Sequence, residues 1–467
     1  MKLTMRSLLR QVVVSVLYLA LIAELAACGV SVDHPQLSAV DVVPVSSSVA
    51  PIDNPLKLVS SQQLDPRLLE LTFTTPAMPA NSDPTTNVIG TTIVRVLVPA
   101  DYEKSSQNYP VLYLLHGAVG SYKDYTDKLS AEDLTKGLSL IVVMPDGGAA
   151  GEYTDWYNNG NAGTPQYETY HIDQLIPWVD AHFRTIAARE GRAVVGLSMG
   201  GFGAMSYAAR HPDLFVTAAA FSGAVDTNNP QQMSITPETI WGPRASEEIR
   251  WRGSNPVDLA GNLKDLNLTM RTGNGMPGGQ QQVFDPVEFT VHQESVSLHE
   301  KLNGLGIPHL WDDYGPGGHA APYWQKDLQE TLPIVMQVFA SPPLQPSTIT
   351  YTAIAPTYSV FGWKVALERA ALEFSTLKDA SVEGFALLGS GSALVTTPAF
   401  YTPGLEYVVT QTIDGSRSSK VLRADANGRM QIPVTLGVSN MFQQYTAIAQ
   451  ATSTNVYAVY VSIAKKN

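Results

Sequence analysis

The chain has 467 residues, enough for two or three domains, and 44% of them are hydrophobic, which is ample for a packed core. A formal net charge of −12 argues against nucleic acid or an anionic membrane surface as the main partner. The single cysteine excludes an intrachain disulfide and a thiolate metal cluster.

The first 28 residues have the pattern of a lipoprotein signal peptide. Three basic residues precede an apolar run, residues 12–23, that is too short to cross a membrane as a helix. Small residues followed by Cys28 then resemble the bacterial lipobox, in which the cysteine is lipidated and becomes the mature N-terminus. We therefore expect an exported lipoprotein, at the outer membrane or cell surface, that is membrane-bound through Cys28. The alternatives are a simple signal peptide cleaved nearby and a buried thiol.

Residues 29–65 are rich in Ser, Val and Pro without helical periodicity, which predicts a tether. From 66 to 341, short apolar strands alternate with amphipathic helices, which predicts a doubly wound, mostly parallel sheet. Strands are expected at 68–74, 91–98, 111–115, 140–144, 193–195, 215–221, 266–270 and 310–312, and helices at 170–183, 202–210, 287–305 and 322–339. The segment 226–261 shows neither pattern.

A proline-rich break at 341–346 is followed by a different pattern. Short alternating strands separated by turn residues are expected at 393–397, 406–412, 430–436 and 456–463. Residues 345–467 are therefore predicted to form a separate all-β sandwich domain.

The most informative motif is Gly-x-Ser-x-Gly at 196–200. It follows an apolar, β-branched run and precedes a helix-like run, which is the strand–turn–helix context of a nucleophile elbow. Flanking glycines allow the strained turn that exposes the hydroxyl. Ser198 is therefore the predicted nucleophile, and a plain glycine-rich turn is the alternative.

A serine nucleophile needs a histidine base and a carboxylate that orients it, and in α/β-hydrolases the acid and then the histidine follow the serine. His319 lies in a glycine-rich loop after the last predicted strand, where the base is expected. The acid is expected near the start of the helix at 287–305, where Asp285 and Glu288 also have the spacing of an N-cap and a capping box. Composition alone does not choose between a cap and a catalytic role.

Several blocks together resemble one esterase family over residues 67–340. They are Tyr113-Leu114-Leu115-His116-Gly117, Tyr153-Thr154-Asp155-Trp156-Tyr157, the elbow through Met205, and Gly317-Gly318-His319. The family includes S-formylglutathione hydrolase, tributyrin esterases and antigen 85-type mycolyltransferases. The resemblance implies an α/β-hydrolase fold and favours Glu288 as the acid, before Asp285 and then Asp312 or Asp313.

The oxyanion donors follow from the same comparison. In α/β-hydrolases one donor is the backbone N–H of the residue after the nucleophile, which here is Met199. The resemblance implies that the second donor is the backbone N–H of Ala118. His116 is then expected to shape the oxyanion loop rather than to act as a base. Asp155 and Trp156 are expected to line the cleft or to brace the loop beside it, and the alternative is a core aromatic pair with a satisfied carboxylate.

These features predict a serine carboxylic-ester hydrolase that works through a Ser-Glu-His triad and an acyl-enzyme, on a small-molecule, lipid or polymeric ester. No cofactor or metal is expected, because the sequence holds no phosphate-binding loop, zinc-protease motif or dinucleotide fingerprint. One alternative is a cell-envelope acyltransferase with the same triad. The oxyanion loop, however, departs from the mycolyltransferase series Asp-Gly-Leu-Arg. A non-catalytic surface protein that binds glycans is the third hypothesis.

Overall fold

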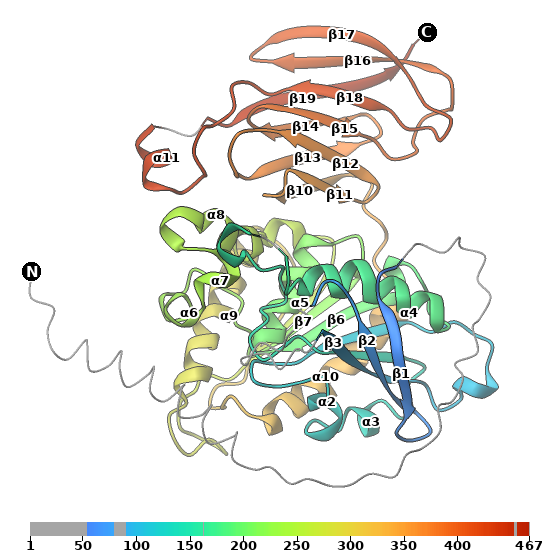
Figure 1. Cartoon of the computed structure of the whole chain (residues 1–467), viewed down its shortest axis with the longest axis vertical. Coiled ribbons are helices and arrows are strands. Elements are labelled where there is room, and N and C mark those ends of the chain that lie inside the picture. The colour runs from blue at the N-terminus through green and yellow to red at the C-terminus, as the bar shows by residue number, and fades with distance from the viewer. Residues whose placement is uncertain (1–53, 79–89, 162, 453–454, 467) are drawn as a thin grey trace, which may run out of the picture.

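The computed structural model describes residues 54–78, 90–161, 163–452 and 455–466 (Figure 1). The predicted signal peptide and Cys28 lie outside the described residues, as does most of the predicted tether. The tether prediction is wrong at its end, because Lys57–Gln63 form strand β1, paired antiparallel with β2. Almost every residue of β1 is exposed. Backbone pairing rather than apolar burial holds this edge strand, so no hydrophobic pattern marks it in the sequence.

The larger domain is built on a nine-stranded sheet in the order β1-β2-β3-β5-β4-β6-β7-β8-β9. The strands after β1 are Leu68–Thr74 (β2), Thr91–Leu97 (β3), Val111–Leu115 (β4), Ile141–Pro145 (β5), Arg192–Leu197 (β6), Thr217–Phe221 (β7), Asn267–Thr272 (β8) and Leu310–Asp313 (β9). From β5 to β9 neighbouring strands run parallel, whereas β1, β2 and β3 are antiparallel additions at one edge. The predicted doubly wound, mostly parallel sheet is therefore confirmed.

Helices cover both faces of this sheet, so the domain has three layers (Figure 1). One face carries α2 (Asp124–Asp127), α3 (Ala131–Leu134) and α10 (Ala321–Ala340). The other carries the π-helical segment η3 (Thr169–Leu175), α4 (Ile176–His182), α5 (Met199–Arg210) and α9 (Pro286–Gly304). Single turns lie at η1 (Tyr102–Lys104), η2 (Asn158–Gly160), η4 (Arg189–Gly191) and η5 (Ala260–Leu263).

The segment 226–261, which shows no pattern in the sequence, is largely helical. It contains α6 (Pro230–Ile235), α7 (Glu238–Trp241) and α8 (Arg244–Ser254). The first two helices have six and four residues, too short to repeat an apolar position over several turns. Trp241 and Trp251 are buried there against Phe202 of α5, which is why this excursion is fixed to the domain.

The C-terminal domain consists of two antiparallel sheets, in the orders β10-β13-β14-β19-β16-β17 and β11-β12-β15-β18. Their strands are Ile349–Ala353 (β10), Thr357–Val360 (β11), Trp363–Glu368 (β12), Ser375–Ser381 (β13), Gly384–Gly389 (β14), Ser392–Thr396 (β15), Glu406–Ile413 (β16), Ser416–Arg423 (β17), Gln431–Thr435 (β18) and Tyr457–Lys465 (β19), with α11 at Ala447–Thr452. Apolar residues of both sheets form one core, as the predicted sandwich requires.

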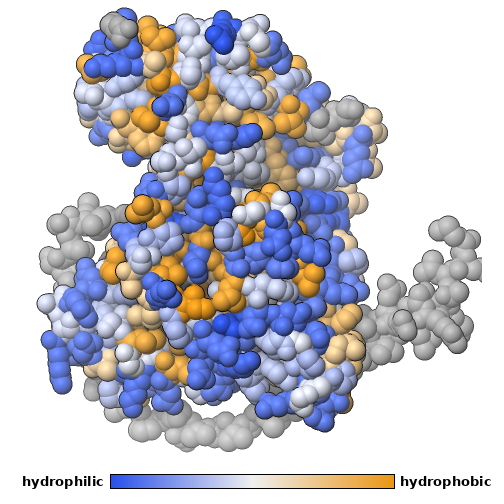
Figure 2. Space-filling model, turned by 180° about the vertical axis from the view of Figure 1, so that it is seen from behind, coloured by the Kyte–Doolittle hydropathy of each residue, from blue (hydrophilic) through white to orange (hydrophobic). Residues whose placement is uncertain are grey.

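The two domains are visible as a smaller and a larger lobe joined at a narrower waist (Figure 2). The surface of both lobes in this view is a mixture of polar and apolar patches. Within the ranges that the structure describes, no helix has the length and apolar character that are needed to cross a membrane.

Candidate active site

The nucleophile elbow is the turn from β6 to α5. Ser198 has φ 54° and ψ −122°, a strained backbone that separates its side chain from the strand and the helix. Glycine is required on both sides. A Cβ at Gly196 would lie 2.0 Å from the carbonyl oxygen of Gly200, and a Cβ at Gly200 would lie 2.0 Å from that of Leu115. Sterics therefore explain the motif, and Ser198 stands just beyond the carboxyl end of a central strand.

His319 is brought to Ser198 by the loop between β9 and α10. The Ser198 hydroxyl is 2.8 Å from His319 Nε2, and His319 Nδ1 is 2.8 Å from Glu288 Oε2. The edge of the imidazole ring packs against Trp324, with centroids 4.9 Å apart and planes at 89°. The three side chains that the sequence predicts are thus within hydrogen-bonding distance in the order that a triad requires.

Glu288 is fully buried and its two carboxylate oxygens have separate partners. Its Oε1 accepts from the Ser222 hydroxyl at 2.8 Å and the Gly273 N–H at 2.7 Å, and the Thr272 hydroxyl, 3.2 Å away, has a shorter bond of 2.9 Å to the carbonyl of Gly273. Oε2 faces only the histidine in these contacts. The donors on Oε1 satisfy the buried group and fix the direction of the other oxygen toward His319.

The alternative acids have other partners. Asp285 caps α9 by accepting from the N–H groups of Val287 and Glu288 at 3.0 and 3.1 Å. Its second oxygen accepts the backbone N–H of His319 at 2.8 Å and contacts no ring nitrogen of that residue. Asp312 is paired with Arg271, and Asp313 with His292. Among the four candidates, only Glu288 contacts the imidazole.

A second buried carboxyl, Asp327, lies behind the triad. Burial raises the pKa of Asp327 to about 8, although the nearby Arg271 acts in the opposite direction. Asp327 is fully buried and lies close enough to Glu288 for the two carboxyls to interact. This direction of the pKa shift favours the uncharged form of Asp327, which limits the negative charge beside Glu288.

The predicted oxyanion donors, the N–H groups of Met199 and Ala118, lie at the elbow and in the loop after β4. Met199 is the first residue of α5, where a backbone N–H has no partner inside the helix. The loop that carries Ala118 lies against the nucleophile, since a Cβ at Gly117 would be 3.2 Å from Ser198 Cβ. The chain then turns at Val119, φ 54°, whose N–H donates to the carbonyl of Ala149 at 2.8 Å. This hydrogen bond fixes the loop directly after Ala118.

His116 holds this loop from behind and does not touch Ser198. Its Nε2 accepts the N–H of Gly147 at 2.8 Å, so its proton is on Nδ1, which donates to the carbonyl of Gly117 at 2.8 Å. The Tyr153 hydroxyl donates to the His116 carbonyl at 2.8 Å. These bonds agree with the expected role in shaping the oxyanion loop. Tyr153 belongs to one of the blocks that carry the family resemblance, but the sequence assigns it no role. Ser222 has no signal in the sequence, because a serine after a strand is not specific.

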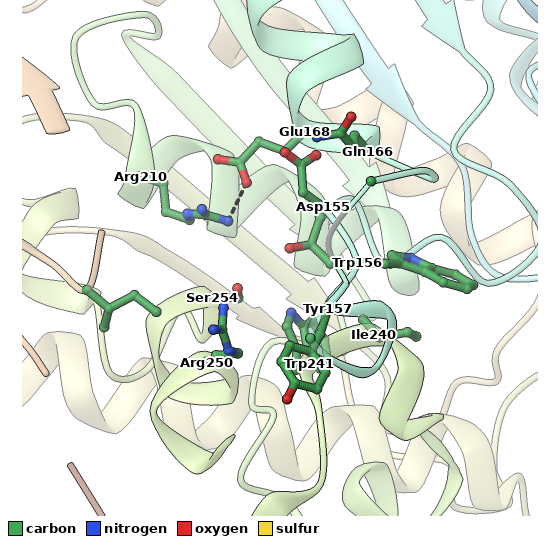
Figure 3. A pocket seen from close by; sticks show the side chains of 14 residues that line it. Asp155, Trp156, Tyr157, Gln166, Glu168, Arg210, Ile240, Trp241, Arg250 and Ser254 are labelled. Carbon is green, nitrogen blue, oxygen red and sulfur yellow. Dashed lines mark ion pairs between the residues drawn. The ribbon is translucent and has the colours of Figure 1, made fainter. Parts of the chain in front are cut away.

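Asp155 braces the start of η3, because it accepts from the N–H and the hydroxyl of Thr169, at 3.0 and 2.6 Å. The indole N–H of Trp156 donates to the carbonyl of Gly151 at 3.1 Å, and its ring packs against the cluster that holds Phe202 and Ala224. Both residues line one pocket, shown in Figure 3. The bracing role expected of Asp155 is present, and the expected place of both residues in the catalytic cleft stays a prediction.

No metal-binding group is evident in the described part of the chain, where no three His, Cys, Asp or Glu side chains are arranged around one point. The groups that meet at Ser198 are a hydroxyl, an imidazole and a buried carboxylate, joined by hydrogen bonds. This arrangement on a sheet of this topology defines an α/β-hydrolase with a serine nucleophile.

A family model described as "Putative esterase" matches residues 87–334, more than half of the chain. The chain therefore belongs to this esterase family. It is 36% identical over 282 residues to "Esterase Rv1288" of Mycobacterium tuberculosis strain H37Rv, a match that covers 56% of this chain and 58% of the relative. The chain thus spans little more than half the length of that relative.

One further relative and one solved structure also match part of the chain. The chain is 31% identical over 265 residues to "Diacylglycerol acyltransferase/mycolyltransferase Ag85B" of Mycobacterium leprae, covering 50% of this chain and 80% of that protein. Among solved structures, an S-formylglutathione hydrolase from Agrobacterium tumefaciens matches with 19% identity and a TM-score of 0.47, over 60% of this chain and 99% of that one. The predicted family resemblance is confirmed.

Proposed function

We propose that this protein is an exported, lipid-anchored serine carboxylic-ester hydrolase. The observation that carries the proposal is the continuous contact from Ser198 through His319 to Glu288, with 2.8 Å at each step. Membership in an esterase family supports the same reaction class.

The reaction has two halves. In the first, Ser198 Oγ bonds to the acyl carbon while His319 Nε2 takes the hydroxyl proton, and the ester C–O bond breaks as that proton passes to the leaving alcohol. In the second, water gives its proton to Nε2 and its oxygen to the acyl carbon, so the acid leaves and Ser198 regains its proton. Glu288 Oε2 accepts from Nδ1–H throughout and stabilises the imidazolium.

The negative oxygen of each tetrahedral intermediate is assigned to the N–H groups of Met199 and Ala118. Backbone donors at these positions act where charge develops, and one such donor contributes about 3 kcal/mol to transition-state stability. The positive end of the α5 dipole adds to this effect at Met199.

The direct test uses p-nitrophenyl acetate and the Ser198→Ala variant. Turnover should fall at least about 10³-fold, whereas Ser297→Ala, on the surface of α9, should leave it unchanged. Mass spectrometry of a slowly hydrolysed ester should show an acyl group on the wild-type chain alone. Equal turnover by the wild type and Ser198→Ala would end the proposal.

Export and anchoring through Cys28 need a separate test, because that residue lies outside the described structure. Cells that express the full chain should incorporate an alkyne-labelled fatty acid into it, and the label should be lost in Cys28→Ala. An unlabelled wild-type chain in the soluble fraction would contradict lipidation without affecting the hydrolase proposal.

A second candidate function is acyl transfer to an alcohol instead of water. It is favoured by the 31% identity to a relative whose name is diacylglycerol acyltransferase/mycolyltransferase. Product analysis with glycerol and with sugars as added acceptors distinguishes the two: hydrolysis gives the free acid at every acceptor concentration, while transfer gives a new ester whose yield rises with the acceptor.

A further inference from the structure

Exposed apolar side chains gather on the loop that joins β8 to α9, next to the loop of the catalytic histidine. Met276, Val283 and Phe284 on this loop, and Phe289 in the first turn of α9, are between 36% and 70% exposed. Single apolar residues are common on protein surfaces, but these four lie together in the segment 276–289. We call the four side chains the apolar rim.

Backbone hydrogen bonds hold the rim in its exposed position. The N–H of Gly275 donates to the carbonyl of Gly317 at 3.0 Å, two residues before His319. Further along the same loop, Gly278 and Gln281 exchange two backbone hydrogen bonds of 2.7 and 2.9 Å, which close a tight turn. The loop is therefore an ordered structure that is fastened to the loop of the base, and it presents its apolar side chains to the outside.

Two rim side chains flank the residue that holds the base. Phe284 precedes Asp285, whose carboxylate accepts the backbone N–H of His319 at 2.8 Å. The rings of Phe284 and Phe289 contact each other, with centroids 5.5 Å apart and planes at 58°. This contact joins the loop and the first turn of α9 into one apolar surface. The surface is connected through Asp285 to His319, and His319 contacts the Ser198 hydroxyl.

An exposed apolar side chain also flanks the nucleophile from the oxyanion loop. Val119 is 53% exposed and directly follows Ala118, the predicted second oxyanion donor. This loop adjoins the nucleophile, because a Cβ at Gly117 would be 3.2 Å from Ser198 Cβ. Exposed apolar groups thus lie on the loop beside the nucleophile as well as on the loop beside the base.

The loops around the site carry no charged side chains. Residues 117–122, 273–284 and 314–325 contain no Asp, Glu, Lys or Arg, although these types make up 15% of the chain. Asp285, the next residue after the second segment, accepts from three backbone N–H groups. Bringing a charge against an apolar phase is costly, because the charge loses its hydration. A border without charges therefore lets an apolar phase come close to Ser198.

This border fits an uncharged apolar phase better than a protein partner. Charged residues begin just outside the loops, where Asp313 pairs with His292 at 2.9 Å. Lys326 pairs with Glu330 at 3.8 Å. A protein docked on the rim would cover the approach to Ser198, whereas a phase of ester molecules brings substrate to it. Removal of apolar surface from water is favourable and non-directional, so such a face can hold a fluid surface.

We propose that the apolar rim and Val119 form an interfacial face that binds aggregated neutral esters, such as droplets of a water-insoluble triester. The inference rests on the proposed ester hydrolysis and names its substrate class, which is esters in an apolar phase rather than esters dissolved in water. An ester molecule at the droplet surface would then reach Ser198 directly from that phase.

The first test measures adsorption to tributyrin droplets. The full-length protein carries Ser198→Ala, so that the droplets are not consumed. Droplets are removed by centrifugation, and the protein left in the water is quantified. Val283→Ser and Met276→Gln are added to this parent singly and together. The matched controls are Val438→Ser and Met441→Gln, at exposed positions in the C-terminal domain. Melting temperatures show whether each variant is folded.

Each rim variant should adsorb roughly fivefold more weakly than the Ser198→Ala parent, and the double variant roughly 25-fold more weakly, because apolar area is lost from the contact. The two controls should adsorb like the parent. Absence of adsorption by the parent, or equal adsorption of rim variants and controls, would overturn the proposal. Light scattering adds a further criterion: if the rim variants changed the oligomeric state but not adsorption, the face would be a contact between two copies, and the proposal would be wrong.

The second test uses the active protein with Ser198 intact. The rate on tributyrin should rise steeply once its concentration passes the solubility limit. The ratio of the rate on emulsion to the rate on dissolved p-nitrophenyl acetate should fall about tenfold in the double variant. A rate that does not rise at the limit, or an unchanged ratio, would contradict the interfacial face. Loss of both activities in the wild type would instead contradict hydrolysis itself, and the adsorption of Ser198→Ala would still show whether the rim binds droplets.

Discussion

Replacing Glu288 with glutamine tests the triad most sharply, because the structure fixes which way the new amide must point. The Ser222 hydroxyl and the Gly273 N–H donate to the Oε1 position, so the amide oxygen must lie there. The NH₂ group then faces Nδ1 of His319, which has to become an acceptor. The ring proton moves to Nε2, and a protonated Nε2 cannot take the proton of Ser198.

The expected loss is large because the base is held in the wrong tautomer while every other contact remains. A tautomer error of this kind in a serine triad lowers kcat by about 10⁴, or roughly 5.5 kcal/mol of activation free energy. The matched control is Asp313→Asn, since this exposed carboxylate pairs with His292 and does not contact His319. We expect it to retain at least about a tenth of the wild-type kcat.

The assay is the steady-state hydrolysis of p-nitrophenyl acetate, with melting temperatures for both variants. Glu288→Gln should remain folded, because glutamine has nearly the same shape and its oxygen satisfies the same donors. If Glu288→Gln kept more than about a tenth of kcat, or if Asp313→Asn lost more activity than it did, the assignment of the acid would be wrong.

Three further outcomes are expected. Gly117→Ala should lower kcat about 10²-fold with little change in KM for p-nitrophenyl acetate. The reason is that the new Cβ would lie 2.8 Å from the Leu197 side chain and displace the oxyanion loop. An unchanged kcat would contradict a role of this loop in binding the oxyanion. Asp327→Asn should raise the free energy of unfolding at pH 7 but not at pH 4. The folded carboxyl, with a pKa of about 8, binds more protons than the unfolded one, so the wild type loses roughly 4 kcal/mol between these pH values; equal denaturant curves at pH 7 would refute this. Phe284→Ser, at an exposed apolar position in the loop beside His319, should lower the butyrate-to-acetate ratio of kcat/KM about threefold, and an unchanged ratio would show that acyl chains do not contact this loop.

The central sheet could be predicted because its parallel strands are buried on both faces, and such strands leave continuous apolar runs such as 111–115 and 140–144. Edge strand β1 could not, since backbone pairing alone defines it. The helices α6 and α7 also escaped prediction, because a helix of one or two turns shows no repeat.

The sequence predicts those residues of the site whose positions follow from the order of strands and loops along the chain. Ser198 and His319 each lie in a loop at the carboxyl end of a strand, and in a parallel sheet those ends meet at one edge. The donors to Glu288 were not predictable, because Ser222 and Gly273 come from two different strand ends and acquire their role only through contact with a third segment. A serine after a strand has the same local signature whether or not a carboxylate lies beside it.

In the sequence, a helix cap and a catalytic acid are competing interpretations of Asp285 and Glu288. In the structure the start of α9 combines the two, because Asp285 caps the helix and Glu288 contacts the ring of His319. Asp285 ends the loop with Oδ1 on the first N–H groups of α9, and the helix direction that follows buries Glu288 one turn later between β7 and β8. The other oxygen of Asp285 holds the backbone N–H of His319. The base is therefore tied to this helix start twice, through its backbone by the cap and through its ring by the acid. Asp285 and Glu288 lie one turn apart at the start of the same helix. A change that moves α9 therefore moves both partners of His319 together.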